Sequence, residues 1–389
     1  GYTTAYLTQP LVCGLQPETF SDFIEQRARW GQGMLQIFMF RNPWLQPGLS
    51  VMQRVLFTNF ALFWGFPVVR LIMLAMPLLS LLFFVPLADA SVIDVLAYCI
   101  PALACSVMTA QFNYGKLRWP FISNLYEVIQ SVHLTISLVH LFRNPRAPQF
   151  KVTPKGEILE KDFVSALARP FYLLVLISLA ALVMGVVRFF DNPGERAMIA
   201  FVSVWAVMDL IFLLCALGVT FERRQRRIYP RVVVDHAAEV RTDHGMTLRG
   251  MLVNASASGA GMRLKMTARL SASLSLANEI ELKVEGTEQR LSVQLQKLKT
   301  LPAGEALLGL TYRFQSIAEE RAAVAVAYGS AAQLNRNLQR RRQGRSVLSA
   351  FGLLLKKAFT RGGGHLLLAA RQKLRLVGLG TASTALEKK

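Results

Sequence analysis

Four apolar stretches of about twenty residues each constrain this chain more than any other feature. A helix of that length can cross the hydrocarbon core of a bilayer. Hydrophobic residues make up 53% of the 389-residue sequence, and charged residues only 17%. The sequence therefore predicts an α-helical membrane bundle with spans at 68–87, 91–111, 170–190 and 197–219.

The charges between these stretches predict which loops face the cytoplasm, because Lys and Arg concentrate in cytoplasmic loops of membrane proteins. The turn after the first stretch holds Asp89 and Asp94 without a nearby cation, so we expect it outside. The cations between 143 and 169 and the arginine run at 223–231 are then expected inside. We assign much of the net charge of +20 to such loops and not to nucleic-acid binding.

The apolar segment 121–142 is ambiguous between a span and an interfacial helix. If it crossed the membrane, the cations that follow it would lie outside, against the positive-inside rule. It also contains Glu127, His133 and His140. We therefore predict an interfacial helix for 121–142 and leave 51–66 open.

The first fifty residues mix polar and apolar side chains. Thr19 is a candidate N-cap for a helix that runs to Phe40, and Trp30 and its neighbouring arginines make this helix amphipathic. The sequence does not begin with Met, and residues 1–12 resemble a strand and turn from inside a domain. We expect the chain to be the C-terminal part of a longer protein.

After the last apolar stretch the character of the sequence changes. Short alternating apolar runs separated by turn residues predict a small β-barrel. We expect a helix at 318–332, followed by a basic tail at 333–389 that is either an amphipathic helix on anionic lipid or a solvated segment. The predicted strands are Arg231–Val234, Thr247–Val253, Gly261–Met266, Glu279–Val284, Leu291–Leu298 and Ala306–Phe314.

The arginine run stands where the last apolar stretch ends and has two interpretations. It is a positive-inside flank, or it is an anion-binding site, since guanidinium forks bind phosphates bidentately. The spacing Arg227-x-x-x-Arg231, followed by Asn254-x-Ser256-x-x-Gly259, favours the second. In this interpretation the arginines clamp phosphates and Gly259 permits a tight turn.

Two further motifs lie on the predicted cytoplasmic side. Gln26-Arg27-Ala28-Arg29-Trp30 places an aromatic plate beside hydrogen-bond donors, which suits a sugar, although an interfacial Trp is usually an anchor. The loop Phe150–Gly156 places Thr153 and Lys155 where they can contact a phosphate. An ordinary basic loop explains this second motif equally well.

Together these motifs resemble those of known families. The Arg227/Arg231 and Asn254–Gly259 pair resembles a PilZ domain, which binds cyclic di-GMP. Gln26–Trp30 resembles the Q(Q/R)xRW motif of processive family-2 glycosyltransferases, and Phe150–Lys155 resembles their FxVTxK gating loop. All three in this order, with spans between them, resemble the catalytic subunits of bacterial cellulose synthases over roughly residues 1–330.

The resemblance implies a domain organisation. Residues 1–50 would be the end of an α/β glycosyltransferase domain, 51–220 a transmembrane channel with a gating loop at 144–162, 221–332 a PilZ barrel and 333–389 a tail. It also implies roles for individual residues. These are Gln26, Arg29 and Trp30 for the acceptor; Phe63 and Trp64 for the channel; Phe150, Val152, Thr153 and Lys155 for the gating loop over UDP; Arg226, Arg227, Arg231, Asn254, Ser256 and Gly259 for cyclic di-GMP; and Glu18 for a latch to a PilZ arginine.

The resemblance further implies partners that this chain does not hold by itself. The substrates would be UDP-glucose and a growing β-1,4-glucan, and a membrane-anchored periplasmic subunit would assist in the bacterial inner membrane. No DxD or Thr-Glu-Asp motif is present, so the catalytic base and the Mg²⁺ ligands are expected upstream of Gly1. The four cysteines show no metal-ligand spacing.

Two alternatives stay open. A membrane-anchored cyclic di-GMP receptor without enzyme activity fits the arginine motif equally well, but it leaves Gln26–Trp30 and Phe150–Lys155 unexplained. A synthase of another β-glucan, such as a mixed-linkage polymer, fits all three motifs.

Overall fold

The computed structural model describes residues 5–7, 14–86, 91–115, 119–147, 152, 156–225, 227, 229–265, 280–341 and 346–366. The chain divides into two compact units. The helical unit comprises Gln16–Arg224 and Gly344–Lys389, and the barrel unit is built mainly from Gln225–Gln343. Three predicted site residues of the loop, Phe150, Thr153 and Lys155, and Arg226 of the arginine run lie outside the described residues.

Local sequence sets the ends of the helices. The Thr19 side chain accepts a hydrogen bond from the backbone of Asp22 and caps α1, as predicted. Ser91 and Asp94 form a reciprocal capping box at the start of α4. The helices of this unit are α1 (Phe20–Phe40), α2 (Val51–Phe63), α3 (Phe66–Phe83), α4 (Val92–Tyr114), α5 (Ile122–Arg143), α6 (Arg169–Asp191) and α7 (Arg196–Val219).

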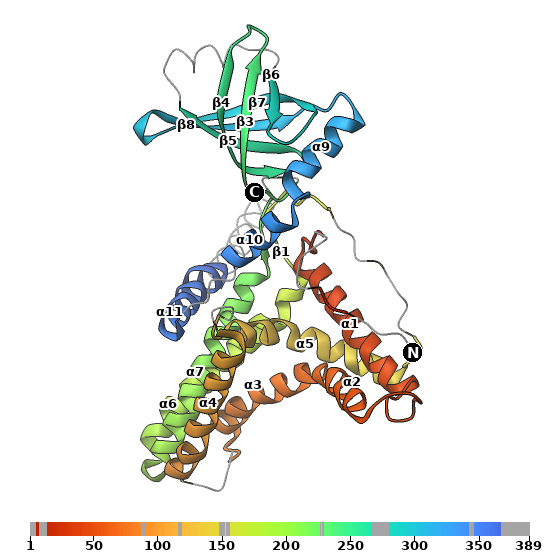
Figure 1. Ribbon diagram of the computed structural model, residues 1–389. Coiled ribbons are helices and arrows are strands. Elements are labelled where there is room, and N and C mark those ends of the chain that lie inside the picture. Colours follow the sequence, from red (N-terminus) through yellow and green to blue (C-terminus); the bar gives the residue numbers. More distant parts are fainter. Residues whose placement is uncertain are drawn as a thin grey trace, which may run out of the picture. The chain divides into compact units, whose positions relative to one another are not determined.

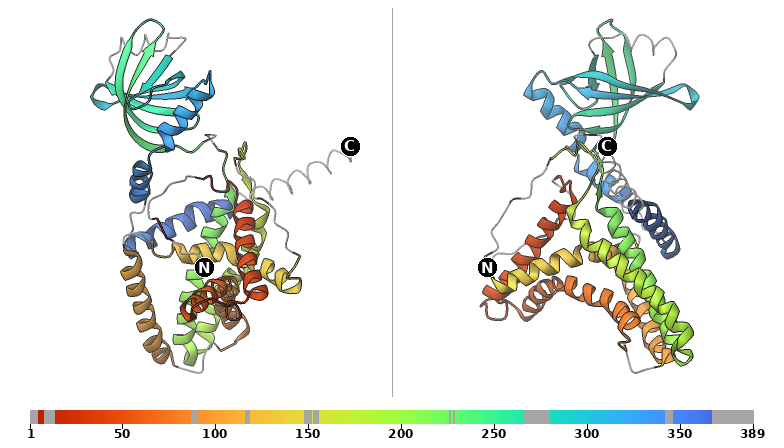
Figure 2. Two further views of the ribbon diagram at one scale, coloured as in Figure 1. Left: turned by 45° about the vertical axis from the view of Figure 1, so that its right-hand side comes forward. Right: turned by 180° about the vertical axis from the view of Figure 1, so that it is seen from behind.

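Among the described residues, five helices are long and apolar enough to cross a membrane: α3, α4, α5, α6 and α7. The four predicted spans fall on α3, α4, α6 and α7. Figures 1 and 2 show α5 running across α6 and α7 rather than alongside them. That direction is the one expected of an interfacial helix, and the placement of α5 in a membrane stays a prediction.

Packing within the unit is uneven. Apolar side chains of α3, α6 and α7 form a buried cluster that includes Leu81, Ala181 and Ala206. No residue of α4 is buried, and its apolar side chains face outward. A helix with this exposure needs lipid or another protein around it, which agrees with a membrane bundle.

A two-stranded ladder joins two distant segments of the helical unit. Strand β1 (Phe163–Val164) follows the predicted gating loop, and it pairs antiparallel with β2 (Phe221–Glu222), which follows α7. The backbone of Arg224 also donates to Asp162 over 2.7 Å. The loop end and the start of the arginine run are therefore held together.

The part of the tail described at 346–366 belongs to the helical unit, whereas α10 belongs to the barrel unit. Helix α11 (Val347–Lys357) continues into a π-helical stretch, Ala358–Gly363, that packs against the end of α7. Ser346 caps α11, and Lys356 and Lys357 occupy its last turn. Figure 2 shows α11 running across α7.

The barrel unit is a closed six-stranded antiparallel barrel with strand order β3-β4-β5-β8-β7-β6 (Figure 1). Leu252, Met262 and Leu308 are among its fully buried side chains. The predicted small barrel is confirmed, and each predicted strand overlaps an observed one. The strands are β3 (Val232–Thr242), β4 (Thr247–Ser256), β5 (Gly259–Lys265), β6 (Ile280–Val284), β7 (Arg290–Leu301) and β8 (Glu305–Tyr312), followed by α9 (Ile317–Tyr328) and α10 (Ala331–Arg341).

Candidate functional site

Helix α1 presents the Gln26–Trp30 motif beside α5. Polar contacts recur along this pair of helices: Gln32 donates to Ser137 Oγ and Gln36 to the carbonyl of Pro145, each over 2.8 Å. Arg27 Nε donates to Gln130 Oε1 over the same distance. These bonds fix which face of α1 lies against α5.

The Arg27 guanidinium lies between two indole rings. Its Cζ is 5.5 Å from the centroid of Trp30 and 4.8 Å from that of Trp64, which are cation–π distances. Burial lowers the pKa of Arg27, but an arginine stays charged at neutral pH. A fixed cation thus holds two aromatic rings beside one another.

The two predicted channel aromatics differ in exposure. Trp64 is buried in a cluster with Leu35 and Leu138, and a Cβ on Gly31 would lie 2.8 Å from its ring. Gly31 is therefore the residue that lets the indole pack flat against α1. Phe63 is 56% exposed, and its ring centroid lies 5.5 Å from that of Phe66.

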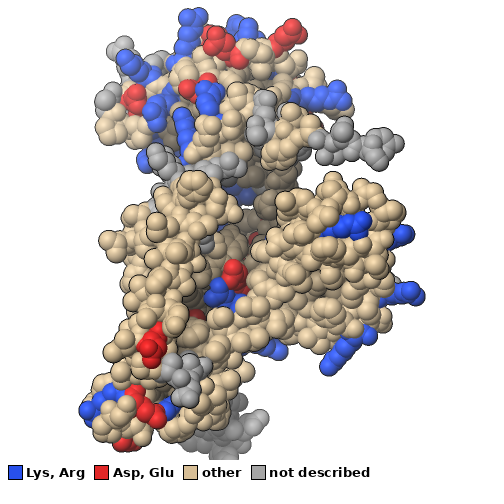
Figure 3. Space-filling model, turned by 60° about the horizontal axis from the view of Figure 1, so that its bottom comes forward, with Lys and Arg blue, Asp and Glu red and all other residues tan. Residues whose placement is uncertain are grey.

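A pocket of about 630 Å³ opens between five helices, and Phe63 lies on its wall. Its lining mixes aromatic rings with hydroxyl, amide and charged groups. The face drawn in Figure 3 shows few charged side chains on the helices, with one group of both signs in a hollow. The lining residues are Arg27 from α1, Phe63 from α2, Phe66 from α3, Tyr114 from α4, and Ser123, Tyr126, Glu127 and Gln130 from α5.

The two charged residues that line this pocket are held in different ways. The Glu127 carboxylate forms an ion pair with Arg70, whose Nε lies 3.0 Å from Glu127 Oε2. Arg27 is bound to the neutral amide of Gln130 and lies beside two indole rings. A pocket with aromatic walls, an ion-paired carboxylate and one cation beside aromatic rings suits a neutral ligand rich in hydroxyl groups.

The sequence pointed to the neighbourhood of this pocket but missed most of its lining. Trp30 is half-exposed beside Arg27, while Gln26 and Arg29 are partly buried on α1 and do not line the pocket. Arg27 does line it. The α5 residues 123, 126, 127 and 130 follow the spacing of one helix face, which is a signal the sequence carries.

The predicted latch carboxylate lies at the end of the predicted gating loop. Glu18 Oε1 accepts a hydrogen bond from the backbone of Gly156 over 3.1 Å. Gly156 has φ +84°, a conformation that favours glycine. Val152 is 72% exposed. The pairing of Glu18 with an arginine of the run stays a prediction.

Sequence reasoning missed a second carboxylate near this point, Glu222. It is buried, and its Oε1 accepts from the backbone of Phe20, at the start of α1, over 2.5 Å. A carboxylate at a helix N-terminus is favoured by the exposed N–H groups and the helix dipole. Burial nevertheless raises the pKa of Glu222, more than this hydrogen bond lowers it.

The barrel unit brings part of the second predicted site together. Val233 on β3 pairs with Asn254 on β4, so Arg231, two residues before Val233, comes close to Asn254. Arg231 Nη1 donates to Asn254 Oδ1 over 2.8 Å. The predicted pairing of these two motifs is thus present in the barrel.

The turn between β4 and β5 depends on Ser256 and Gly259. Ser256 Oγ donates to the carbonyl of Gly259 over 3.0 Å, and the strands pair these two residues directly. A Cβ on Gly259 would lie 2.3 Å from the carbonyl oxygen of Leu310. Only glycine fits there without moving β8.

Among the described residues, neither Arg227 nor Arg231 forms an ion pair with a carboxylate. Burial and then the nearby positive charge of Arg227 lower the pKa of Arg231. Tyr312 is buried near Arg231, and burial raises the pKa of its hydroxyl. That hydroxyl has no hydrogen-bond partner among the described residues. Two neighbouring arginines, one of them near a hydroxyl without a described partner, can bind an anion.

Within the described part of the chain, no group of three or more His, Cys, Asp or Glu side chains is placed to hold a metal ion. Cys99, Cys105 and Cys215 are free. We therefore assign no step to a metal on these residues.

Comparison with known sequences decides the family. Residues 1–112 match the model of glycosyl transferase family group 2. The cellulose synthase catalytic subunit of Pseudomonas fluorescens is 34% identical over 268 residues, which cover 68% of this chain. The chain belongs to the bacterial cellulose synthase family. Cellulose synthase 1 of Komagataeibacter xylinus is 35% identical over 70% of the chain, and the catalytic subunit of Xanthomonas axonopodis is 29% identical over 96%.

The matched region is only part of each relative. It spans 36% of the Pseudomonas subunit, 18% of the Komagataeibacter protein and 51% of the Xanthomonas subunit. Among solved structures, the PilZ domain of YcgR from Escherichia coli covers 30% of this chain at 17% identity, with a TM-score of 0.24. The PilZ domain of CeSA from a cellulose-synthesizing bacterium covers 26% at 16% identity, with a TM-score of 0.19. TM-scores this low add nothing to what the strands of the barrel show.

Proposed function

We propose that this chain is the channel and regulatory part of a processive, inverting glycosyltransferase. The whole protein would transfer glucose from UDP-glucose to the 4-hydroxyl of a β-1,4-glucan and move the polymer across the bacterial inner membrane. The observation that carries the proposal is the pocket among α1, α2, α3, α4 and α5, which combines aromatic walls with hydroxyl and amide groups.

The pocket suits a glucan for a physical reason. A glucose unit has flat C–H faces that stack on aromatic rings and an edge of hydroxyl groups that needs hydrogen bonds. Phe63, Phe66 and Tyr126 supply the rings, and Ser123 and Gln130 supply polar partners. A polar polymer crosses lipid only where protein lines its path. The acceptor end would bind next to Gln26, Arg29 and Trp30, with the exposed Trp30 ring as a plate.

The chemical step belongs to residues outside those described. The described residues contain no metal-binding group, so they give no support for placing Mg²⁺ on them. When bound elsewhere in the protein, Mg²⁺ would neutralise the departing UDP. The role of this chain would be to hold the acceptor and guide the product.

The barrel would bind cyclic di-GMP as a PilZ domain. Arg227 and Arg231 would hold its phosphates, with Arg226 in support. Asn254 and Ser256 would set the geometry of the turn beside them. The support for this proposal is that Arg231, bound to Asn254, lies near a second arginine, and neither has an ion pair among the described residues.

The signal would reach the gating loop through the chain itself. The arginine run follows Glu222 directly in sequence, and Glu222 holds the start of α1 while β2 holds β1. Glu18 holds Gly156 at the loop end. A ligand that binds and moves the arginine run would therefore alter contacts that position the gating loop. That loop would cover UDP with Phe150, Val152, Thr153 and Lys155.

Full-length protein in proteoliposomes tests the proposal with radiolabelled UDP-glucose and cyclic di-GMP. Gln130→Met removes the acceptor of Arg27 inside the pocket, and we expect polymer formation to fall about tenfold as one hydrogen bond to a charged group is lost. Gln32→Met removes another contact between α1 and α5 outside the pocket and should change little. Equal effects of the two substitutions would contradict a role of the pocket in handling polymer.

Two observations would favour the other candidates. The barrel site does not depend on the pocket, so a receptor without enzyme activity is supported if cyclic di-GMP binds and no polymer forms. Another β-glucan is supported if the product resists a β-1,4-specific endoglucanase. Labelling of intact spheroplasts tests the proposed cytoplasmic location of the barrel. Co-purification tests the proposed periplasmic subunit.

A further inference from the structure

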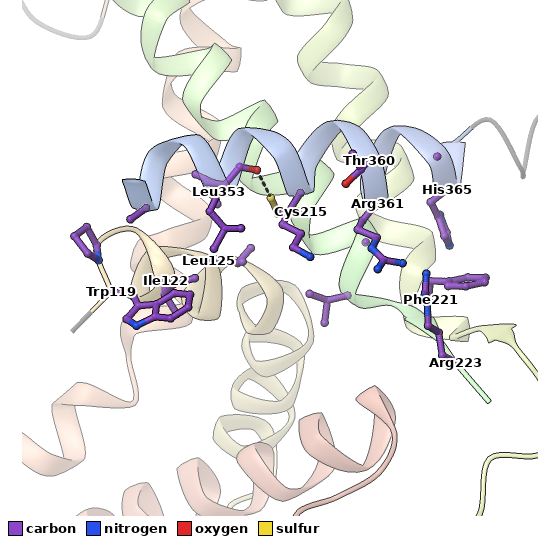
Figure 4. A pocket seen from close by; sticks show the side chains of 17 residues that line it. Trp119, Ile122, Leu125, Cys215, Phe221, Arg223, Leu353, Thr360, Arg361 and His365 are labelled. Carbon is purple, nitrogen blue, oxygen red and sulfur yellow. Dashed lines mark hydrogen bonds between the residues drawn. The ribbon is translucent and has the colours of Figure 1, made fainter. Parts of the chain in front are cut away.

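A second pocket in the helical unit has a different character from the first. It has a volume of about 480 Å³ and lies between the start of α5, the end of α7 and the continuous helix formed by α11 and the π-helical stretch. Figure 4 shows α11 and its extension lying along one side, with α5 and α7 opposite. None of the predicted site residues lines it.

The lining of this pocket changes from one end to the other. Figure 4 places Trp119, Ile122 and Leu353 at one end, and Arg361, Arg223 and His365 at the other. Lys357 adds a third cation, and the described lining includes no carboxylate. An apolar end joined to a cationic end matches a molecule with a hydrocarbon chain and an anionic group.

His365 supplies an independent observation. It is only 4% exposed, and its Nδ1 lies 2.8 Å from the hydroxyl of Tyr172. Its Nε2 is buried without a hydrogen-bond partner among the described residues. Burial lowers the pKa of His365, which favours a neutral ring at neutral pH. If the Tyr172 hydroxyl donates to Nδ1, Nε2 carries the proton and offers a free donor at the cationic end.

Close packing keeps the pocket open rather than collapsed. A Cβ on Gly362 would lie 2.1 Å from the carbonyl oxygen of Leu214, so the π-helical stretch touches the backbone of α7. Cys215 Sγ donates to the carbonyl of Leu354 over 3.5 Å. π-Helical turns are rare and often occur at functional sites. The two elements are thus fixed against each other at two points along the pocket.

From these observations we propose that this pocket binds an anionic glycerophospholipid. The phosphate would contact Arg361, Arg223 and His365 Nε2, while the first part of an acyl chain would lie along Trp119, Ile122 and Leu353. The occupant would come from the cytoplasmic leaflet, since the arginine run at the end of α7 is predicted inside. This inference does not rest on the proposed glucan synthesis.

Trp119 provides the reporter for a test. Full-length protein in mixed micelles is titrated with phosphatidylglycerol brominated on its acyl chains, and with brominated phosphatidylcholine as the neutral lipid. The signal of Trp119 is the difference in fluorescence quenching between the parent protein and Trp119→Phe. We expect phosphatidylglycerol to quench Trp119 at an about tenfold lower mole fraction than phosphatidylcholine, because the cations attract an anionic headgroup.

Matched substitutions decide the origin of that preference. Arg361→Gln combined with Lys357→Gln removes two cations of the pocket and should bring phosphatidylglycerol to the level of phosphatidylcholine. Lys356→Gln removes the neighbouring exposed cation of α11, which does not line the pocket, and should leave the preference intact. Circular dichroism and gel filtration confirm that each variant is folded. Equal quenching by both lipids in the parent, or an unchanged preference in the double variant, would overturn the proposal.

Discussion

The pocket beside α1 and the arginine site on the barrel treat charge in opposite ways. At the pocket the Glu127 carboxylate is neutralised by Arg70, and Arg27 is held by the Gln130 amide and lies close to two indole rings. On the barrel, Arg231 is also held by a neutral amide but lies near a second arginine, and neither arginine has an ion pair among the described residues. A single cation beside aromatic rings suits a neutral polymer, and two neighbouring cations without a carboxylate suit an anion. The difference assigns the two sites to different classes of ligand.

The largest effect is expected from Arg231→Ala. Losing a partly buried guanidinium that holds a phosphate removes about 2–5 kcal/mol of binding free energy, so the Kd for cyclic di-GMP should rise about 30-fold or more. Isothermal titration calorimetry on the full-length protein measures it. Arg249→Ala is the control, because Arg249 is an exposed barrel arginine paired with Glu239. An unchanged Kd for Arg231→Ala would remove the anion site from the barrel.

At the pocket, Phe63→Ala should have a smaller effect. One stacked aromatic contact contributes roughly 0.5–1.5 kcal/mol, so polymer formation should slow about three- to tenfold while the Kd for cyclic di-GMP stays constant. Phe57→Ala is matched in exposure on the same helix but does not line the pocket. If Phe57→Ala slows polymer formation as much as Phe63→Ala does, the pocket is not the polymer path.

The arginine site was more accessible to sequence reasoning than the pocket, for a physical reason. In a barrel, strand pairing fixes which residues meet, so two short motifs on neighbouring strands are enough to predict Arg231 beside Asn254. The pocket is lined by residues from five helices, and no local motif predicts how these helices pack against one another. The α5 residues 123, 126, 127 and 130 share one helix face, but the prediction of an interfacial helix for 121–142 rests on the loop charges and does not use that spacing.

Two carboxylates make contacts that no motif predicts. Glu18 accepts a hydrogen bond from the backbone of Gly156, while its predicted pairing with an arginine stays a prediction. Glu222 accepts from the backbone of Phe20, 202 residues away in the sequence. Bonds from side chains to distant backbone groups leave no pattern in the sequence, because any residue can offer an N–H.

Glu222 is a buried carboxylate of the helical unit whose described partner is a backbone N–H and not a cation. It tests whether such a partner offsets the cost of burying the charge. Burial raises its pKa above the ordinary 4.5, so in that range the folded state holds more protons than the unfolded state. The stabilising contribution is full below pH 4.5 and is lost as pH rises through the raised value. Glu222→Gln keeps an acceptor for Phe20 and removes this titration. We therefore expect a flatter dependence of Tm on pH between 4.5 and neutrality, measured by differential scanning fluorimetry.

Glu281→Gln is the control for that experiment. Glu281 is an exposed barrel carboxylate paired with Arg290, so its substitution should leave the slope of Tm against pH in place. If Glu222→Gln shows the same slope of Tm against pH as the parent, the pKa of Glu222 does not change between the unfolded and folded states. The backbone N–H would then compensate it as fully as Arg70 compensates Glu127.

The smallest effect, and the one that bears most directly on the contrast between the sites, is expected from Asn254→Asp. An aspartate here would lie where the amide oxygen now accepts from Arg231 over 2.8 Å, and it would compensate part of the guanidinium charge. In a partly solvated site such a pair contributes about 0.2–1 kcal/mol, so the Kd for cyclic di-GMP should rise by no more than a few-fold. The same titrations at increasing salt should show a weaker salt dependence than the parent, because less positive charge remains unpaired. Tighter binding with an undiminished salt dependence would show that the carboxylate acts by positioning Arg231, and that uncompensated charge is not what makes this turn bind an anion.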